Sequence, residues 1–275
     1  MRHLKRILKR SVLSPYIYVS LDKLREISPN KKSIFGFQFR GPKEMRLGEY
    51  EKYLVDFLVP RFLIDTTFVN IGANIGYFAS IAKNLGVQRI IAIEPEKTNF
   101  KILASNLEKI NSKSICELLN IAVGEKNEEG ELFGHATGAS LLKNWEGDVS
   151  KSGIKVQIRS LDALIHEYNI ENKSIFLIDV EGSEYGLISS SMNSLSTHSD
   201  SLWVIEVSMF RTINGVTLLD TNFSTFLGLF ERMGYHIYSW LGDFQLLGKK
   251  EIQDLTSGRY KLSALIFVFS KSYLI

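Results

Sequence analysis

Strand-like and helix-like segments alternate along most of this chain of 275 residues. Short apolar runs are followed by segments in which apolar residues recur with a helical period, which indicates repeated strand–helix units. The runs expected to form strands are 68–71, 89–95, 115–123, 155–161, 174–180, 201–208, 235–240 and 262–270. This alternation predicts an α/β fold with a mostly parallel sheet and helices on both faces.

The last two expected strands differ from the others in their connection. The sequence between them is polar, contains glycine and has little helical pattern. A parallel pair needs a crossover segment, usually a helix, whereas an antiparallel pair does not. We therefore expect the sheet to end in an antiparallel hairpin. Residues 124–153 also lack a regular pattern, and we expect them to be loop-like.

Two glycines mark the junction between the first expected strand and the next helix, in the segment FVNIGANIGYFAS at 68–80. Glycine allows positive φ and close approach of a ligand, and we expect free N–H groups at the helix start to receive anionic oxygens. Glu94 follows Gly72 by twenty-two residues and ends the second strand, where a carboxylate can accept both hydroxyl protons of a ribose. The GxNxG spacing, in place of GxGxxG, disfavours a pyrophosphate ligand.

The composition excludes several classes of protein. A net charge of +3 is too small to indicate a nucleic-acid binder, and no NPPY-like tetrapeptide follows the fourth strand to receive a flipped base. A single cysteine, Cys116, excludes an internal disulfide framework and fits a reducing compartment. We therefore expect a cytoplasmic protein without a nucleic-acid partner.

The first thirteen residues, MRHLKRILKRSVL, place cations on one helical face and apolar residues on the other. This pattern is typical of a helix that lies on a membrane surface, and it predicts peripheral contact of residues 1–13 with the inner face of the membrane. The alternative is a basic helix that packs on the protein's own core, or a frayed terminus.

Seven segments together resemble the FkbM-type methyltransferases, S-adenosylmethionine-dependent O-methyltransferases that often act on sugars or polyketides. In chain order they are NIGANIGYF, IAIEPEKTNFKIL, LLNIAVG, GASLL, IRSLDALI, IDVEGSE and WVIEVS. The resemblance covers about 45–270 and implies a Rossmann-like class I methyltransferase fold, with a mostly parallel seven-stranded sheet that ends in an antiparallel hairpin. We expect an N-terminal extension at 1–45 and a methyltransferase domain at 46–275, in which about 124–160 form an insertion or lid over the active site.

The resemblance also assigns residues to the cofactor. It implies that the glycine loop lines the methionine end, that Glu94 holds the ribose in a turn shaped by Pro95 and Asn99, and that Ala122 and Val123 flank the adenine. The loop residues are Gly72, Ala73, Asn74 and Gly76. The family usually carries Asp where this chain has Asn70. Because Asn lacks the negative charge, we expect weaker cofactor binding, and the alternative is a degenerate protein that binds the cofactor without catalysis.

Carboxylates lie at the ends of the strands expected at 174–180 and 201–208, where the reacting groups of this topology should lie. We expect Asp179, Glu181 and Glu206 to be catalytic, because clustered carboxylates repel one another and one of them gains the pKa of a useful base. Asp179 and Glu206 could instead bind Mg²⁺ through oxygen ligands. His135 lies in the irregular segment and is a further candidate base, with an ordinary loop histidine as the alternative.

These residues predict an S-adenosylmethionine-dependent O-methyltransferase that acts on a hydroxyl of a saccharide, glycolipid or related natural product. A nicotinamide-dependent oxidoreductase is the alternative from another enzyme class. The expected partner is a small-molecule or glycan acceptor. If residues 1–13 bind lipid, a lipid-linked glycan becomes a reasonable acceptor.

Overall fold

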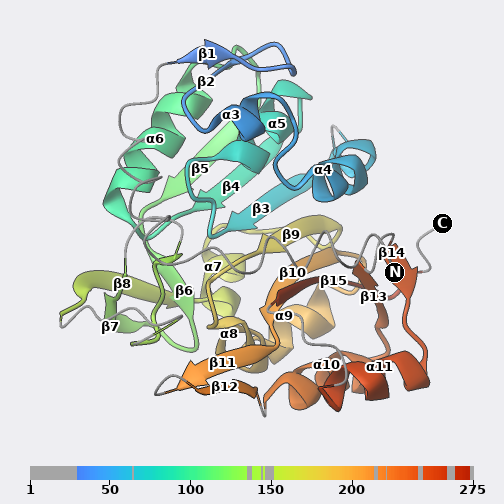
Figure 1. The fold of residues 1–275 in the computed structure, drawn as a ribbon. Coiled ribbons are helices and arrows are strands. Elements are labelled where there is room, and N and C mark those ends of the chain that lie inside the picture. The colour runs from blue at the N-terminus through green and yellow to red at the C-terminus, as the bar shows by residue number, and fades with distance from the viewer. Residues whose placement is uncertain are drawn as a thin grey trace.

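An eight-stranded sheet with the strand order β14-β13-β15-β10-β9-β3-β4-β5 forms the centre of the protein (Figure 1). The computed structural model describes residues 30–63, 65–134, 138–143, 145, 152–213, 216–220, 222–240, 244–258 and 264–272. The strands of this sheet are β3 (Thr67–Ile71), β4 (Arg89–Ile93), β5 (Ile115–Leu119), β9 (Ser174–Ile178), β10 (Leu202–Ser208), β13 (His236–Trp240), β14 (Phe244–Leu246) and β15 (Ala264–Ser270). The five strands from β5 to β10 are parallel, and β15 is antiparallel to both β10 and β13. The α/β fold and the antiparallel end of the sheet are therefore confirmed.

The expectation of seven strands is wrong, because the connection between β13 and β15 contributes an eighth. Residues Phe244–Leu246 fold back on β13 as β14, with Leu246 opposite Tyr238. The same connection contains the helix α11 (Lys249–Thr256), which we did not expect. Leu255 is the buried residue of this helix, so its apolar face is too narrow to give a clear helical pattern.

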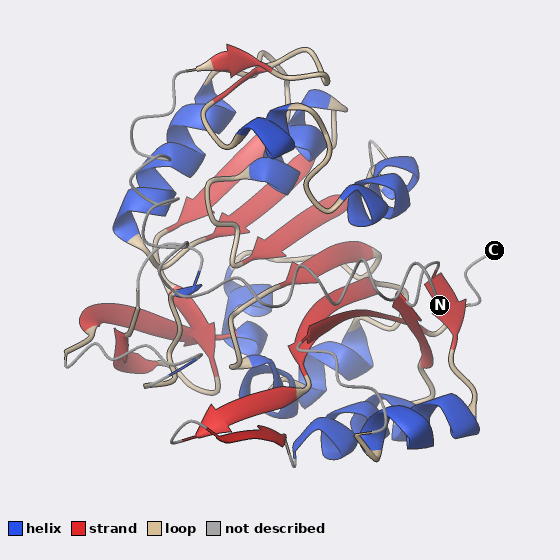
Figure 2. Cartoon of the chain, viewed as in Figure 1, coloured by secondary structure: helices blue, strands red, loops and turns tan. Residues whose placement is uncertain are grey.

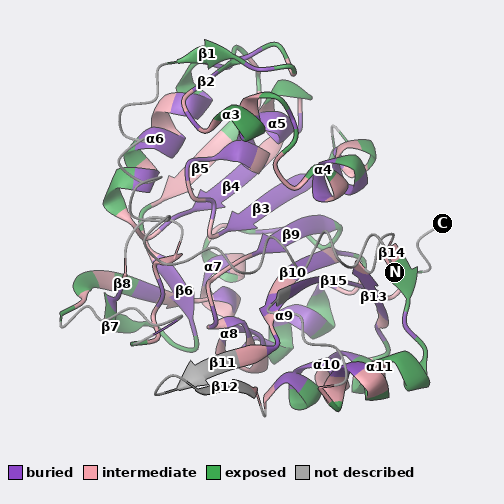
Figure 3. Cartoon of the chain, in the orientation of Figure 1, coloured by how far each residue is buried: buried purple, intermediate pink, exposed green. Residues whose placement is uncertain are grey.

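Helices cover both faces of the sheet, as expected (Figure 2). One face packs against α4 (Lys52–Leu58), α5 (Tyr77–Asn84) and α6 (Lys97–Glu108). The other packs against α7 (Leu161–Glu167), α8 (Glu184–Ser189), α9 (Met192–Thr197), α10 (Asn222–Arg232) and α11. Strand β3 alternates between the two cores, since Phe68 packs on the first face and Val69 on the second. This double coverage explains why the central strands are mostly apolar and are buried throughout (Figure 3).

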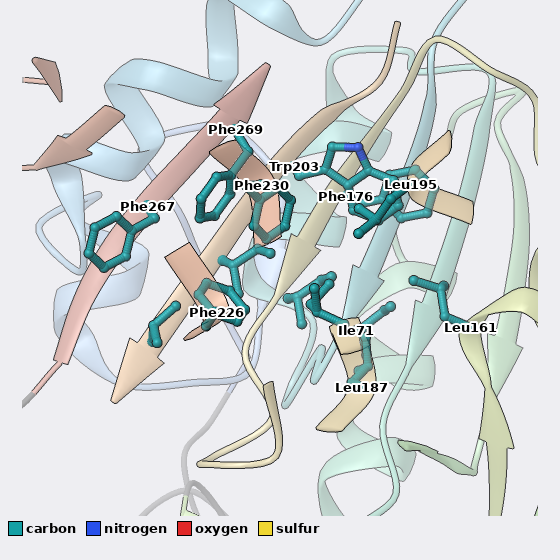
Figure 4. Packing of buried hydrophobic residues seen from close by; sticks show 14 of the residues in the cluster. Ile71, Leu161, Phe176, Leu187, Leu195, Trp203, Phe226, Phe230, Phe267 and Phe269 are labelled. Atoms are coloured by element: carbon teal, nitrogen blue, oxygen red, sulfur yellow. The ribbon is translucent and has the colours of Figure 1, made fainter. Parts of the chain in front are cut away.

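Aromatic side chains fill the second core, where Phe176 stacks on Trp203 with 4.1 Å between ring centroids and Phe230 stacks on Phe269 at 3.7 Å (Figure 4). All four rings have no exposed surface. The stacks join β9, β10, β15 and α10, so they hold the parallel half of the sheet to its antiparallel end.

A small second sheet, with the order β6-β8-β7, lies beside the main one (Figure 1). It contains β6 (Ala122–Gly124), β7 (Glu128–Leu132) and β8 (Ile154–Ser160). The single strand expected at 115–123 is therefore wrong, because the chain leaves the main sheet at Asn120, whose side-chain amide donates to the carbonyl oxygens of Glu94 and Pro95. The loop-like reading of 124–153 is also wrong at β7, whose mostly acidic sequence EEGEL hides its strand pattern.

The residues that precede α4 pack on the same core as the sheet. They form a hairpin of β1 (Lys31–Lys32) and β2 (Gln38–Phe39), followed by α3 (Lys43–Arg46). Phe37, Phe39 and Met45 are buried in the cluster that contains α5 and α6. A short 3₁₀ helix, η1 (Val59–Arg61), follows α4, and a hairpin of β11 (Phe210–Ile213) and β12 (Val216–Leu219) follows β10. The helix expected at 1–13 lies outside the described residues. None of the described helices is long and apolar enough to cross a membrane.

Candidate functional site

Two adjoining pockets lie beyond the carboxyl ends of the parallel strands, where β3 is flanked by β4 on one side and β9 on the other. This is the position at which open α/β sheets bind ligands. We call the pocket of about 550 Å³ next to β4 the first pocket and the one of about 490 Å³ next to α4 the second pocket. Gly72, Asn74 and Asp179 line both, so the two spaces meet at the end of β3.

Most residues that the sequence suggested for a site line one of these pockets. The first pocket is lined by Gly72, Asn74, Glu94, Pro95, Ala122, Val123, Asp179 and Glu181. The second is lined by Asn70, Gly72, Ala73, Asn74, Asp179 and Glu206. Gly76 and Asn99 line neither and lie behind them, and His135 lies outside the described residues.

The glycine loop is shaped mainly by its packing inside the protein. Gly72 has a φ of +79°, and a Cβ there would lie 1.7 Å from the carbonyl oxygen of Asp179. Gly76 has a φ of +81°, and a Cβ there would lie 2.5 Å from the Leu103 side chain on α6. Both positions therefore need glycine so that β9 and α6 can approach the loop.

The N–H groups of this loop are bonded within the protein, so residues 72–76 offer no free donors, and the donors expected for an anion are left to the helix start at Tyr77. Gly72 and Ala73 donate to the Ile93 carbonyl, and Asn74 donates to the Glu94 carboxylate. The next two N–H groups donate to the Asn74 side chain and to the Ala73 carbonyl. The loop thus presents a surface poor in hydrogen-bond donors.

Glu94 is a buried carboxylate that faces the first pocket, and 5% of its surface is exposed. Its two oxygens accept from the N–H groups of Asn74 and Glu96, at 2.8 and 2.9 Å. The Asn99 side chain supports it from behind with a further hydrogen bond. Burial raises the pKa of Glu94 to about 7, against the opposing effect of these hydrogen bonds. These three hydrogen bonds use three of the about four acceptor sites of a carboxylate, so one site remains for a hydroxyl proton of a ligand.

Apolar side chains form the rest of the first pocket. Ala122 and Val123 of β6, with Ile121 and Pro95, give it a wall without charge. Leu132 of β7 and Leu141 line it from the segment that includes the small sheet. A pocket with the Glu94 carboxylate on one side and this apolar wall on another suits a flat heterocycle joined to a sugar.

Four carboxylates lie near the end of β9, and they belong to Asp179, Glu181, Glu184 and Glu206. Glu206 is half-buried, and burial followed by the charges of Asp179 and Glu51 raises the pKa of Glu206 well above its usual value. Glu184 is 4% exposed and lines neither of the two pockets, and it accepts from the Gly182 N–H at 2.8 Å. Burial raises the pKa of Glu184 to about 7. Glu184 therefore supports the turn after β9, whereas Asp179 and Glu206 face the second pocket.

Glu181 is held in a strained backbone conformation, with a φ of +53°. The Ser140 hydroxyl donates to its carbonyl at 2.6 Å, and the Trp145 indole N–H donates to its carboxylate at 3.2 Å. Trp145 is buried against Gly182, where a Cβ would lie 2.3 Å from the indole ring. Trp145 therefore packs onto the fold and fixes the position of Glu181.

Three polar residues of the second pocket were missed by the sequence analysis, namely Tyr50, Glu51 and Tyr77. The charge of Glu51, followed by burial, raises the pKa of Tyr50 well above its usual value. Within the described part of the chain, the buried Tyr77 hydroxyl and the buried Asn70 Oδ1 have no hydrogen-bond partner. Tyr50 and Glu51 directly precede α4, and no local sequence pattern marks them as part of a site.

A metal site finds no support in the part of the chain that the structure describes. There, no group of three or more His, Cys, Asp or Glu side chains has an arrangement that could hold a metal ion. Asp179 and Glu206 both face the second pocket with Glu51, but among the described residues these three carboxylates do not form a group that could hold a metal ion. The Mg²⁺ expectation thus rests on two carboxylates alone.

Comparison with solved structures gives several similar chains, among them the following three. A precorrin-6y C5,15-methyltransferase from Geobacter metallireducens is 14% identical, covers 85% of this chain and 94% of its own, and has a TM-score of 0.45. The N-terminal domain of human METTL16 in complex with SAH is 12% identical, with coverage of 93% and 81% and a TM-score of 0.45. A putative methyltransferase, yhhF, from Escherichia coli is 11% identical, with coverage of 89% and 100% and a TM-score of 0.44.

Comparison with sequences gives a family assignment. None of the curated protein sequences compared matches this chain. The family model described as the methyltransferase FkbM domain matches residues 70–237, from β3 into β13. This match spans more than half of the chain and includes the glycine loop, Glu94 and the carboxylates after β9 and β10. The resemblance noted from the sequence motifs is therefore confirmed, and the chain belongs to the FkbM methyltransferase family.

Proposed function

We propose that this protein is an S-adenosylmethionine-dependent O-methyltransferase that modifies a hydroxyl of a saccharide, glycolipid or related natural product. The observation that carries the proposal is the position of Glu94. Its buried carboxylate faces a pocket with apolar walls, and that pocket meets a second, acidic pocket at Gly72, Asn74 and Asp179. A nucleoside in the first pocket would therefore point its reactive end toward the carboxylates of the second.

The residues of the first pocket fit the nucleoside part of the cofactor. Glu94 would accept from the ribose through the acceptor site that its three hydrogen bonds leave open. Ala122 and Val123 would contact the base. In the second pocket, the Oδ1 of Asn70, which has no partner among the described residues, offers an acceptor to a donor group of the ligand. When bound, S-adenosylmethionine supplies an electrophilic methyl group.

Two carboxylates are placed to manage the proton of the acceptor hydroxyl. Asp179 and Glu206 face the same pocket, and the charge of Asp179 contributes to the raised pKa of Glu206. Glu206 therefore takes up a proton readily and leaves Asp179 as the base. As the hydroxyl oxygen gains the methyl group, its proton passes to the Asp179 carboxylate.

The shape and chemistry of the second pocket favour a saccharide-like acceptor. The rings of Tyr50 and Phe78 are half-buried there and supply apolar faces for a sugar ring. Asp179 and Glu206 supply hydrogen-bond acceptors for its hydroxyl groups. The basic amphipathic pattern of residues 1–13 supports a glycolipid at the inner membrane face as the form of this acceptor.

Calorimetry tests the cofactor. We expect S-adenosylhomocysteine to bind at micromolar concentrations and NAD not to bind. We also expect the Glu94→Ala variant to lose its affinity for S-adenosylhomocysteine. Binding of NAD in place of S-adenosylhomocysteine would favour an oxidoreductase, and binding at full strength by Glu94→Ala would remove Glu94 from the site.

Transfer of labelled methyl groups to fractionated glycans and lipids of the source cell, with and without chelator, tests the acceptor. We expect label in a saccharide-containing fraction, and loss of most of it with Asp179→Asn. Vesicle cosedimentation of the full chain and of a chain without residues 1–13 tests the membrane contact. Equal sedimentation of the two would contradict it.

A further inference from the structure

The second pocket is built to accept hydrogen bonds and positive charge. Three carboxylates line it, from Glu51, Asp179 and Glu206. The described residues that line this pocket include no Lys, Arg or His. The N–H groups of the adjacent loop at 72–76 are already bonded inside the protein. A ligand here must bring its own donors and would be favoured by a positive charge.

An independent observation points to a missing donor at the same place. Asn70 is 3% exposed and faces this pocket, and its Oδ1 has no partner in the described part of the chain. A buried amide oxygen that lacks a hydrogen bond is costly, so such atoms are commonly satisfied by a ligand or water. Asn70 is neutral, however, and cannot neutralise a cation by itself.

Glu51 lines this pocket and has an unusual backbone conformation. It precedes α4 with a φ of +42°, in the left-handed region that non-glycine residues seldom adopt. Its side chain makes no capping hydrogen bond to the helix, so helix capping does not explain the strain. Its carboxylate is close enough to influence Tyr50, Tyr77 and Glu206, since its charge raises the pKa of each of these groups.

We infer that Glu51, with the Asn70 Oδ1, binds the ammonium group at the amino-acid end of the cofactor, an inference that rests on the proposed function. A primary ammonium has three N–H donors and one positive charge. It would satisfy Asn70, pair with Glu51 and reduce the repulsion among the carboxylates of the pocket. Glu51 lies outside the segment that the family model matches, so the family comparison does not reveal it.

Two ligands separate the amino-acid end from the nucleoside. S-adenosylhomocysteine carries the ammonium, whereas 5′-methylthioadenosine retains the nucleoside and the thioether but lacks the amino-acid group. We would measure the affinity of both by calorimetry for the full-length wild type, Glu51→Gln and Glu94→Gln. Glu49→Gln is the matched control, because this substitution removes the same charge. Glu49 is exposed, lies two residues from Glu51 and lines neither pocket.

We expect Glu51→Gln to lower the affinity for S-adenosylhomocysteine at least about tenfold, because a hydrogen bond between charged groups is lost in that complex. The affinity for 5′-methylthioadenosine should stay within about twofold of the wild-type value, because that ligand has no ammonium group. Glu94→Gln should lower the affinity for both ligands, and Glu49→Gln should change the affinity for neither. An equal effect of Glu51→Gln on both ligands, or no effect, would overturn the role of Glu51 and leave the proposed function intact. Failure of the wild type to bind either ligand would overturn both.

A second variant separates binding from folding. Glu51→Gly removes the carboxylate and relieves the left-handed strain, because glycine adopts positive φ without a steric penalty. We expect its thermal midpoint to equal or exceed that of the wild type, while its affinity for S-adenosylhomocysteine falls as in Glu51→Gln. If Glu51→Gly instead unfolds at lower temperature and keeps its ligand affinity, Glu51 is structural and the inference fails.

Discussion

Replacing Glu94 by Gln should change how the stability of the ligand-free protein depends on pH. Burial raises the pKa of Glu94 from 4.5 to about 7 in the folded state. The folded protein then binds more protons than the unfolded chain between these two values, so its free energy of unfolding falls as pH rises through this window. Below about pH 4.5 this cost is absent, and above about pH 7 it is fully present.

The size of the effect follows from the same pKa. The difference between 4.5 and about 7, at about 1.36 kcal/mol for each pKa unit, corresponds to about 3 kcal/mol for this group, which is 5% exposed. Gln removes that cost, but it has one carbonyl oxygen and cannot accept from the N–H groups of both Asn74 and Glu96. The lost acceptor costs about 1–3 kcal/mol at every pH. The absolute difference in stability is therefore small near pH 8, whereas its change with pH is large.

Urea unfolding of the wild type and Glu94→Gln between pH 4.5 and pH 8 measures this change. We expect the difference in free energy of unfolding to shift by about 3 kcal/mol in favour of Gln as pH rises. Glu184→Gln is the control, since Glu184 is 4% exposed with a pKa of about 7 but lines neither the first nor the second pocket. It should show a similar shift and keep its affinity for S-adenosylhomocysteine, which Glu94→Gln should lose. A difference that stays constant over the whole pH range would refute the reasoning for Glu94.

Three further substitutions test the loop, the second pocket and the core. Gly72→Ala should cost about 2 kcal/mol more in urea unfolding than Gly86→Ala, because both have positive φ but only at Gly72 would the Cβ meet the backbone of Asp179; equal costs would contradict this. Asn70→Asp should bind S-adenosylhomocysteine about fivefold more tightly by calorimetry, since the new charge faces the expected ammonium, and unchanged or weaker binding would count against that charge. Phe176→Ala should lower the free energy of unfolding by about 3–5 kcal/mol, and a loss below about 1 kcal/mol would show that this fully buried ring contributes little.

Periodic and local signals predicted the parallel half of the fold. Strands such as β3 and β9 are buried throughout because helices cover both faces, and their mostly apolar sequences make that pattern visible. The end of the chain was harder to predict, since β14 is three residues long and α11 buries little apolar surface. The break between β5 and β6 depends on hydrogen bonds from Asn120 to residues twenty-five and twenty-six positions away, which no local pattern contains.

The residues of the candidate site also divide into those that the sequence identified and those that it did not. Glycines at a strand–helix junction and an acid at the next strand end are recognisable from spacing, so Gly72 and Glu94 were identified as neighbours before the structure placed them at one pocket. Glu51 was not identified, because its role depends on a left-handed backbone turn and on the packing of α4 beside β3. The use of the loop N–H groups inside the protein also depends on the position of Ile93 in the neighbouring strand.

The site concentrates features that are unfavourable in the ligand-free fold. Glu51, Asn74 and Glu181 have positive φ, and each lines one or both pockets. Burial also raises the pKa values of Glu94 and Glu206, so ionising either carboxylate costs free energy that a cationic, hydroxyl-bearing ligand would recover. A ligand that binds only the folded state stabilises it in proportion to the logarithm of its affinity. The affinity for S-adenosylhomocysteine should depend on the carboxylates being ionised. The rise in thermal midpoint that this ligand produces should therefore increase between pH 5 and pH 8, in the range where the protein without ligand loses stability.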